Sequence, residues 1–324
     1  MEFKDFTTGK NDDGRRLDRV LRIFLNQKSL SEIYKLIRKG LIKVNQKKTK
    51  PDAHVNQGDI ISIADFLFEQ NQNDEKIAKQ KPHVNLKIVF ENEHLLIIDK
   101  PYGRSVHGSS NENGISLDKE VLSYWEAENK NNKEQSLSFR PGPLHRLDRN
   151  TTGLLVFSKS LEGAKWFSES IKNHTVQKKY LGIAEGILQK EENWQDKLAG
   201  SEERNQSFYT VSQNENGSLA ITTARPLACG KLSGNDVTLV EYAIKTGRKH
   251  QIRAQSQLHG HPLAGDKAYG GKKYKELTRE YYLHAYSLTF PQENPLELPQ
   301  EIKTDLPDDF KSLLQYCEIE NHSL

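Results

Sequence analysis

The sequence predicts an α+β protein of two domains, and three observations support that fold class. Residues 14–68 show two amphipathic helical patterns followed by short strand patterns. Residues 69–82, "EQNQNDEKIAKQKP", are polar with almost no apolar side chains, and they predict a flexible linker. Residues 83–324 contain mainly strand patterns, which predict a mixed, mainly antiparallel β-sheet with flanking helices.

Composition narrows the class of protein. The chain has 324 residues, of which 35% are hydrophobic and 28% charged, so it is polar but long enough for two cores. Its two cysteines, Cys229 and Cys317, are too few for a disulfide framework or a four-thiolate metal site, which favours a reducing compartment. Because the start does not resemble a secretory signal and the apolar runs are short, we expect a cytoplasmic monomer without membrane contact.

Positive charge is concentrated in the first domain. Residues 14–63 hold twelve Lys or Arg against four Asp or Glu, a local excess of eight positive charges. Since the whole chain carries a formal net charge of +3, the remaining residues carry a balance of −5. A small basic domain on a mildly acidic body predicts an attachment that binds a polyanion. An ordinary surface rich in lysine is the alternative interpretation.

Local patterns define the elements of the first domain. Residues 15–27 and 29–40 predict two helices, the second beginning at Ser31 as N-cap and ending at Gly40. Residues 41–63 alternate in polarity and turn near Asn45, which predicts short strands. The apolar face of the first helix comprises Leu17, Val20, Leu21, Phe24 and Leu25.

The second domain begins with two short strands around a turn at Glu91 and Asn92. A polar insertion at 125–138 predicts a surface loop. We find no phosphate-binding loop and no dinucleotide fingerprint in the chain, and we expect no cofactor. The later elements that we predict are strands at 154–157, 180–186 and 237–244, a helix at 161–172, and a helix at 248–260 that ends at Gly260.

The stretch "PLHRLDRNTTGLLVFSKS", residues 143–160, places a charged turn directly before a buried strand. Charged loop residues at the end of a buried strand often carry chemistry, which makes Asp148 a candidate. The alternative is that Asp148 only bonds nearby backbone amides, as aspartates in turns commonly do.

Four segments resemble one known family. "HRLDRNTTG" resembles the signature of the RluA-type pseudouridine synthases, and "DKPYGRSVH", "KKYLGIAEG" and "KTGRKHQIRAQSQLHGHPLAGDKAYG" match that family in the same order. The first domain resembles the RNA-binding domain named after ribosomal small-subunit protein four. The combination is most similar to RluC-type enzymes, which implies isomerisation of uridine to pseudouridine in large-subunit (23S) ribosomal RNA.

The resemblance also implies roles for single residues. Asp148 matches the essential aspartate, which acts as a nucleophile on the ribose or as a base that removes a ribose proton. Arg253 matches the arginine that pairs with this aspartate, and we expect a bidentate contact between them. Tyr180 matches the tyrosine that stacks on the target uracil. Arg146 matches a residue that fills the space left by the flipped base.

Other residues complete the predicted contacts. We expect Leu283 to form an apolar wall of the uracil pocket, and His145 and Thr151 to shape the loop around Asp148. Core packing is an equally good interpretation of Leu283. The residues expected to contact RNA through the first domain are Arg15, Arg16, Arg19, Lys35, Arg38, Lys39, Lys47 and Lys48.

Three alternatives remain open from the sequence. One is a non-catalytic RNA-binding or ribosome-assembly protein, and another is a family member that acts on transfer RNA. A third is a metal-dependent hydrolase that uses His259, His261 and Asp266, because "HGHPLAGD" superficially resembles ligand spacing. Gly260 and Pro262 favour a helix end and turn there instead, so we expect no metal.

Overall fold

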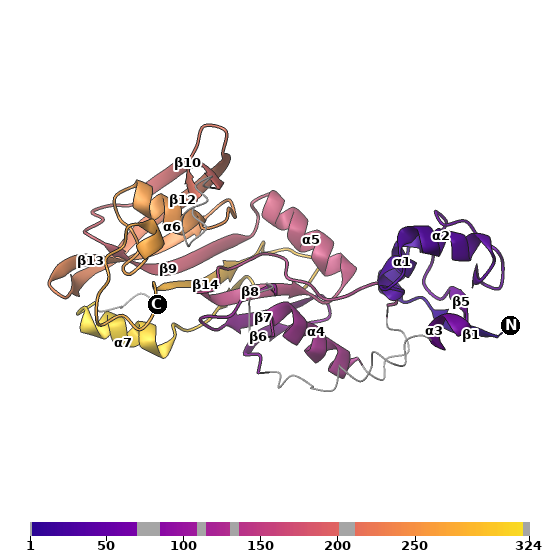
Figure 1. The fold of residues 1–324 in the computed structure, drawn as a ribbon. Coiled ribbons are helices and arrows are strands. Elements are labelled where there is room, and N and C mark those ends of the chain that lie inside the picture. Colours follow the sequence, from indigo (N-terminus) through magenta and orange to yellow (C-terminus); the bar gives the residue numbers. More distant parts are fainter. Residues whose placement is uncertain (1, 70–84, 109–114, 130–135, 201–210, 320–324) are drawn as a thin grey trace.

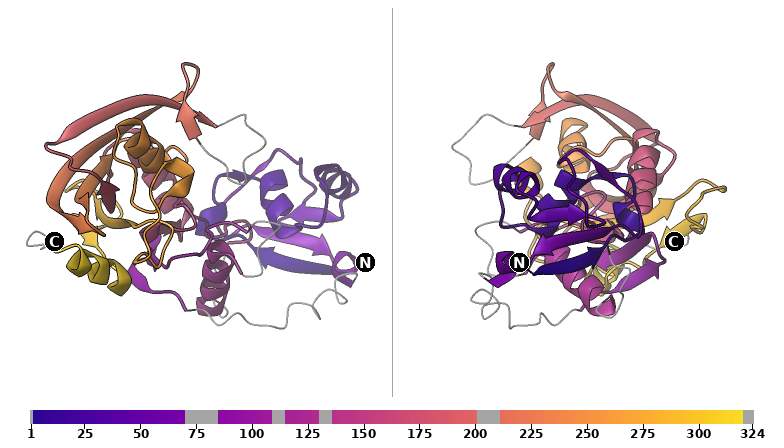
Figure 2. Two further views of the ribbon diagram at one scale, coloured as in Figure 1. Left: turned by 60° about the vertical axis from the view of Figure 1, so that its left-hand side comes forward. Right: turned by 90° about the vertical axis from the view of Figure 1, so that its right-hand side faces the viewer.

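A computed structural model describes residues 2–69, 85–108, 115–129, 136–200 and 211–319 of the chain. The N-terminal residues form a small lobe at one end of a larger body, while the C-terminal helix lies at the opposite end (Figure 1 and Figure 2). Apart from Glu69, the predicted linker at 69–82 lies outside the described residues.

The N-terminal lobe contains both predicted helices and the predicted short strands. A strand that the sequence analysis did not predict precedes them: β1 pairs with β5 from Phe3 to Thr7, so the sheet of the lobe begins before residue 14. The sheet has the antiparallel order β1-β5-β3. The elements are β1 (Phe3–Thr7), η1 (Lys10–Asp12), β2 (Arg15–Arg16), α1 (Leu17–Phe24), α2 (Leu30–Arg38), β3 (Ile42–Val44), β4 (His54–Val55), β5 (Ile60–Ala64) and α3 (Phe66–Glu69).

The second helix starts two residues earlier than predicted. Ser29, not Ser31, is the N-cap of α2, because its side chain accepts a hydrogen bond from the Glu32 N–H while the Glu32 carboxylate accepts from the Ser29 N–H. This reciprocal pair satisfies two amides at the helix start. Gly40 follows the helix with a φ of +73°, which agrees with the predicted stop.

One sheet of ten described strands organises the body. Its order is β11-β10-β12-β13-β9-β14-β8-β7-β6, and β15 pairs with β14. Only β8 and β14 run parallel among these pairs, which confirms a mixed, mainly antiparallel sheet. The strands are β6 (Ile88–Glu91), β7 (Leu95–Lys100), β8 (Thr152–Ser158), β9 (Gln177–Glu185), β10 (Glu192–Gly200), β11 (Val211–Gln213), β12 (Ser218–Leu232), β13 (Asn235–Ile244), β14 (Leu283–Thr289) and β15 (Glu301–Lys303).

The helices of the body are α4 (Leu117–Glu128), α5 (Leu161–Lys172), α6 (Gln251–Leu258), η2 (Lys267–Tyr269) and α7 (Asp308–Tyr316). The predicted helix at 161–172 coincides with α5. The predicted surface loop at 125–138 is wrong where the structure describes it: residues up to 128 belong to α4, and Trp125 is buried. Its residues 130–135 lie outside the described part of the chain.

Alternation along the central strands separates two cores. In β8, Leu155 and Phe157 join the cluster that contains α4 residues, while Leu154 and Val156 join the cluster that contains Phe167 of α5. Successive side chains of a strand point to opposite faces of the sheet, so a strand between two cores is apolar at nearly every position. This explains why β8 is buried along its whole length.

The N-terminal lobe contacts the body through a buried carboxylate. Asp12 accepts hydrogen bonds from the Ser136 hydroxyl at 2.6 Å, from the Leu137 N–H at 2.8 Å and from the Ser138 N–H at 3.0 Å. The Gly9 N–H donates to the same carboxylate at 2.9 Å. These donors satisfy a fully buried carboxylate and fasten residues 136–138 of the body to the lobe.

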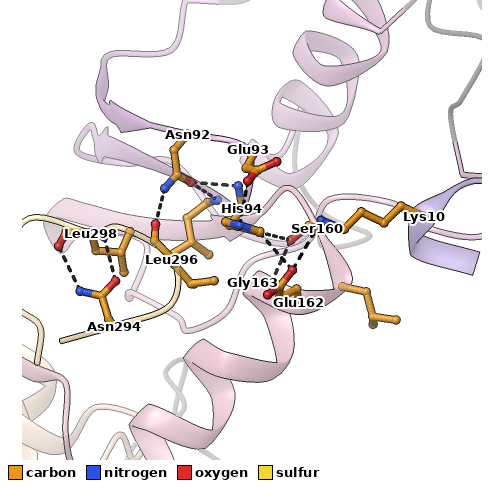
Figure 3. Close-up of polar contacts among 12 residues, drawn as sticks. Lys10, Asn92, Glu93, His94, Ser160, Glu162, Gly163, Asn294, Leu296 and Leu298 are labelled. Atoms are coloured by element: carbon orange, nitrogen blue, oxygen red, sulfur yellow. Dashed lines mark hydrogen bonds and ion pairs between the residues drawn. The ribbon is translucent and has the colours of Figure 1, made fainter. Parts of the chain in front are cut away.

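A second contact lies at the start of α5 (Figure 3). The His94 ring contacts the Ser160 hydroxyl at 2.9 Å, and that hydroxyl accepts the Gly163 N–H as the N-cap of the helix. Two residues after Ser160, the Glu162 carboxylate forms an ion pair with the Lys10 ammonium of the lobe at 3.7 Å. The turn between β6 and β7, the start of α5 and the lobe therefore meet at one place.

Candidate active site

A buried lysine binds the backbone of the loop before β8. The ammonium of Lys100 donates to the carbonyl oxygens of Arg149 and Thr151, each at 2.8 Å, and of Pro101 at 3.1 Å. Lys100 is 0% exposed, and this burial lowers its pKa to about 7. Because Arg149 and Thr151 follow Asp148 within three residues, Lys100 fixes the backbone that carries the aspartate.

Gly153 lets that loop enter the sheet. It has a φ of +106°, and a Cβ on it would lie 2.2 Å from the carbonyl oxygen of Ala285 on β14. Only glycine therefore permits the parallel approach of β8 and β14 at this point. The same approach brings Leu283 of β14 close to the loop of Asp148.

A cavity of about 280 Å³ opens beside Asp148. A second hollow of about 260 Å³ lies against the same carboxylate and is lined by Ser105, Val106 and His107 of the early "DKPYGRSVH" segment. Segments far apart in the sequence thus converge on one carboxylate. All seven residues predicted to act in catalysis or substrate binding line the first cavity: His145, Arg146, Asp148, Thr151, Tyr180, Arg253 and Leu283.

Arg253 corrects one expectation. Its bidentate partner is Asp266, with Nε–Oδ2 at 2.6 Å and Nη2–Oδ1 at 2.8 Å, and not Asp148. The remaining Nη1 approaches Asp148 Oδ2 at 3.6 Å. The guanidinium carbon also lies over the rings of Tyr269 and Tyr281, at 4.7 and 4.4 Å from their centroids. A guanidinium held by Asp266 and by two aromatic rings offers a single oriented cation to Asp148.

His250 is a site residue that the sequence analysis missed. Its Nδ1 lies 2.8 Å from the Tyr269 hydroxyl, and its Nε2 lies 3.8 Å from Asp148 Oδ1. Burial lowers its pKa to about 4, so the ring is neutral at physiological pH. His250 has a φ of +54° just before α6, a left-handed backbone that is unusual for histidine. Such outliers cluster at functional sites, but sequence alone does not reveal them.

Tyr180 and Leu283 form one wall of the cavity. They lie on the adjacent strands β9 and β14, on the face that belongs to the α4 core. Tyr180 is 6% exposed, and burial together with the charge of Asp148 raises its pKa. The phenol is therefore protonated throughout the physiological range and is a proton donor rather than a base.

His145 is tied to the sheet. Its Nε2 accepts a hydrogen bond from the Val156 N–H at 3.1 Å, and its ring stacks on Phe167 with centroids 6.1 Å apart. Burial lowers its pKa to about 3, so the ring stays neutral. These contacts agree with a structural role in the loop, while the neighbouring Arg146 is exposed at the cavity mouth.

The residues expected to contact RNA through the lobe divide into two groups. Arg15 donates to the Ser138 hydroxyl at 2.8 Å, and Arg16 binds Asp18 through Nε and Nη2, so both guanidinium groups already have protein partners. The other six side chains are exposed, and they are Arg19, Lys35, Arg38, Lys39, Lys47 and Lys48.

The three residues of the metal hypothesis have separate partners. His259 stacks on Trp194 and contacts Asp196 at 3.1 Å, whereas the ring of His261 contacts a backbone carbonyl. Asp266 binds Arg253. Among the described residues, no group of three or more His, Cys, Asp or Glu side chains has a metal-binding arrangement. In this structure the three side chains therefore do not gather around a common position.

Both parts of the chain match known protein families. Residues 94–258 match the family model of RNA pseudouridylate synthase, and residues 15–61 match the S4 domain. Ribosomal large subunit pseudouridine synthase D of Nitrosomonas europaea is 33% identical over 331 residues, which cover 98% of this chain and 89% of that protein. Ribosomal large subunit pseudouridine synthase C of Haemophilus influenzae is 30% identical over 309 residues, which cover 89% and 87%.

Solved structures agree on the fold. Human RNA Pseudouridylate Synthase Domain Containing 4 has a TM-score of 0.57 at 22% identity, covering 78% of this chain and 98% of that one. Human RNA Pseudouridylate Synthase Domain Containing 1 has a TM-score of 0.55 at 23% identity, covering 72% and 88%. An S4 lobe on this body defines an RNA-modifying enzyme. The chain belongs to the RNA pseudouridylate synthase family, and it is an isomerase that converts uridine in RNA to pseudouridine.

Within the described residues, no helix is both long enough and apolar enough to cross a membrane.

Proposed function

We propose that this enzyme modifies uridines of the large-subunit (23S) ribosomal RNA and that Asp148 is its essential catalytic residue. The catalytic role is supported by the position of the Asp148 carboxylate in a cavity, 3.6 Å from Arg253 Nη1 and 3.8 Å from His250 Nε2. The relatives that align over 89% and 98% of this chain are named for the large ribosomal subunit, which supports the choice of RNA.

The carboxylate is suited to act on the ribose of the target nucleotide. Its side chain is 15% exposed, so it is partly desolvated yet open to the cavity. A nucleophile and a base both act as the carboxylate, and the Arg253 cation faces this carboxyl group while neutral His250 adds no competing charge. Because Asp266 and two tyrosine rings hold Arg253, that cation is ready before substrate binds. Attack on C1′ and removal of a ribose proton both remain compatible with this geometry.

The target uridine must leave its stack to reach Asp148. We propose that its base enters the cavity of about 280 Å³, stacks on Tyr180 and packs against Leu283. Arg146, exposed at the mouth, then takes the space that the base leaves in the RNA. His145 and Thr151 keep the loop in shape through their contacts with Val156 and Lys100.

The surface beside the cavity suits a phosphate backbone. A neighbouring hollow of about 990 Å³ is lined partly by the basic residues Arg149, Lys249, Lys267 and Lys273. Together with the exposed cations of the lobe, these side chains supply phosphate contacts, which carry much of the affinity for RNA. We also propose that the enzyme acts as a cytoplasmic monomer without a cofactor, since isomerisation needs neither an oxidant nor a group donor.

The test uses total RNA from cells that lack the protein, incubated with purified enzyme and a metal chelator. Pseudouridine is mapped at single-nucleotide resolution. We expect new sites in the large-subunit RNA with the wild type, and none with Asp148→Asn, which keeps the shape but removes the charge. Asp236→Asn in the exposed ion pair with Lys231 is the matched control and should behave as wild type. Sites only in transfer RNA would overturn the proposed target, and turnover by Asp148→Asn would overturn the catalytic role.

A further inference from the structure

Lys178 is a buried cation in the wall of the active cavity. It lies on β9 two residues before Tyr180, so both side chains point to the same face of the sheet. Lys178 is 5% exposed and lines the cavity with Asp148 and Leu283. Its Nζ lies 3.6 Å from the place that a Cβ on Gly247 would occupy. The amine therefore sits between strand β9 and the turn that leads to α6.

The Lys178 ammonium lacks a protein partner in the part of the chain that the structure describes. Within the described residues, Lys178 forms no hydrogen bond or ion pair, although buried cations are normally paired. The other buried lysine, Lys100, donates to three carbonyls, and the adjacent Lys179 pairs with Glu241 at 3.6 Å. Burial lowers the pKa of Lys178 to about 8, so it still carries its charge at neutral pH. Burying an unpaired ammonium is unfavourable because the charge loses its hydration. Since this ammonium faces the substrate cavity, we expect a group of the substrate to pair with it.

We propose that Lys178 contacts the target uracil and stabilises the negative charge that the ring acquires when it is detached from the ribose. The inference rests on the proposed function and adds a catalytic residue to it. When the C1′–N1 bond breaks, its electron pair stays with the base, and the charge spreads over N1 and the two carbonyl oxygens. An ammonium in a desolvated wall stabilises such a charge far better than water does.

The remaining steps need no co-reactant, because the electron pair and the protons that leave one position of the uracil return at another. The uracil anion turns and its C5 attacks C1′, so the electron pair that left with the base forms the new C1′–C5 bond. C5 then loses its proton and N1 gains one, which restores a neutral ring. Lys178 needs only to hold its charge through the turn, and its flexible four-carbon stem allows the ammonium to follow the moving oxygens.

The surroundings favour the base over a phosphate as the partner of Lys178. Apolar side chains of Leu144, Ile171, Ile244 and Leu283 line the same cavity, which suits a flat ring. A phosphate needs several donors to replace its water, and exposed cations such as Arg146 are available for it at the mouth. A single recessed ammonium matches a carbonyl oxygen better.

The experiment compares Lys178→Met, Lys178→Arg and the matched control Lys179→Met under single-turnover conditions with total RNA from cells that lack the protein. Lys178→Met keeps the length of the stem and removes the charge. We expect its rate at saturating RNA to fall by about a hundredfold, as for loss of one donor to a developing anion. RNA affinity and its salt dependence should stay unchanged. Lys178→Arg should recover part of the rate, and Lys179→Met should match the wild type.

Two further readouts separate catalysis from structure. Thermal stability of Lys178→Met should equal or exceed that of the wild type, because an unpaired buried charge is removed. RNA that contains 5-fluorouridine should show a smaller defect in the rate of C1′–N1 cleavage, since the electron-withdrawing fluorine makes the base a better leaving group. Because C5 then carries fluorine and has no proton to lose, this rate is followed as loss of intact 5-fluorouridine and not as formation of pseudouridine. A wild-type rate in Lys178→Met, or weaker RNA binding with an unchanged rate, overturns the inference. Absence of pseudouridine formation by the wild type would instead overturn the proposed function, and the inference with it.

Discussion

Asp266 and Arg253 form a buried bidentate ion pair behind the cavity, and this pair determines which atom of Arg253 faces Asp148. With Nε and Nη2 bound to Asp266 at 2.6 and 2.8 Å, only Nη1 points to the catalytic candidate, at 3.6 Å. Asp266 does not touch the space for the substrate base. We therefore infer that it acts through Arg253, as a positioning residue.

Asp266→Asn should lower the single-turnover rate by about tenfold to a hundredfold, because a misplaced guanidinium no longer orients the Asp148 carboxylate. Leaving Arg253 partly unpaired should also lower the free energy of unfolding by about 3 kcal/mol, so the rate is measured at a temperature where the variant is folded. RNA affinity should not change. Asp236→Asn serves as the surface control. A folded Asp266→Asn enzyme with the wild-type rate would refute the positioning role.

The exposed cations of α2 and of Lys39, which follows it, should supply sequence-independent affinity for RNA. Replacing Lys35, Arg38 and Lys39 together by alanine should weaken binding and make its salt dependence shallower by about two to three units of the log–log slope. The single-turnover rate at saturating RNA should be nearly unchanged, since all the cavity residues lie in the body. The control replaces three exposed lysines of the body, Lys190, Lys303 and Lys311. Equal slopes for the two triple variants would contradict an RNA contact by α2.

Asp12 should hold the lobe against the body. Asp12→Ala removes the acceptor of the Leu137 and Ser138 amides, which should lower the free energy of unfolding by about 1–3 kcal/mol. Hydrogen exchange at those two amides should become faster. Asp5→Ala, an exposed substitution in the same lobe, is the control and should leave exchange unaltered. Unchanged protection of residues 137 and 138 in Asp12→Ala would show that the carboxylate does not fasten the lobe.

Lys100 should make stability depend on pH. Its pKa is about 7 in the folded protein against an ordinary value of 10.5, because burial disfavours the charge. Between these values the unfolded chain binds more protons, so the free energy of unfolding gains a contribution that rises with pH. Below pH 7 the cost of the buried charge is fully present. The measurement is urea unfolding at pH 6.5 and 9.

The wild type should gain stability relative to Lys100→Met between those two pH values. Exposed Lys231→Met, as the comparison variant, should show no such trend. If the difference in unfolding free energy between the wild type and Lys100→Met stayed constant over this interval, the pKa of Lys100 would be unshifted. Because Lys100 also holds the loop of Asp148, Lys100→Met should lower the single-turnover rate at both pH values.

The sequence by itself determined the elements whose signals are local. Helix α5 coincides with the helix predicted at 161–172, and β8 contains the short apolar run predicted as a strand at 154–157. The motif residues, which were predicted to act together from the resemblance to a known family, do line one cavity. Even the error at the start of α2 is local, since Ser29 and Ser31 both fit an N-cap and only the reciprocal contact with Glu32 distinguishes them.

Only the tertiary structure decided which charges meet. Asp266, thirteen residues along the chain from Arg253, became its partner through the packing of η2 against α6, and no periodicity records that approach. The same holds for β1, whose pairing with β5 needs residues about sixty positions away. Lys100 and Lys178 look like ordinary surface lysines in the sequence. Their burial, and with it their lowered pKa values, depends on which side chains from distant strands close around them.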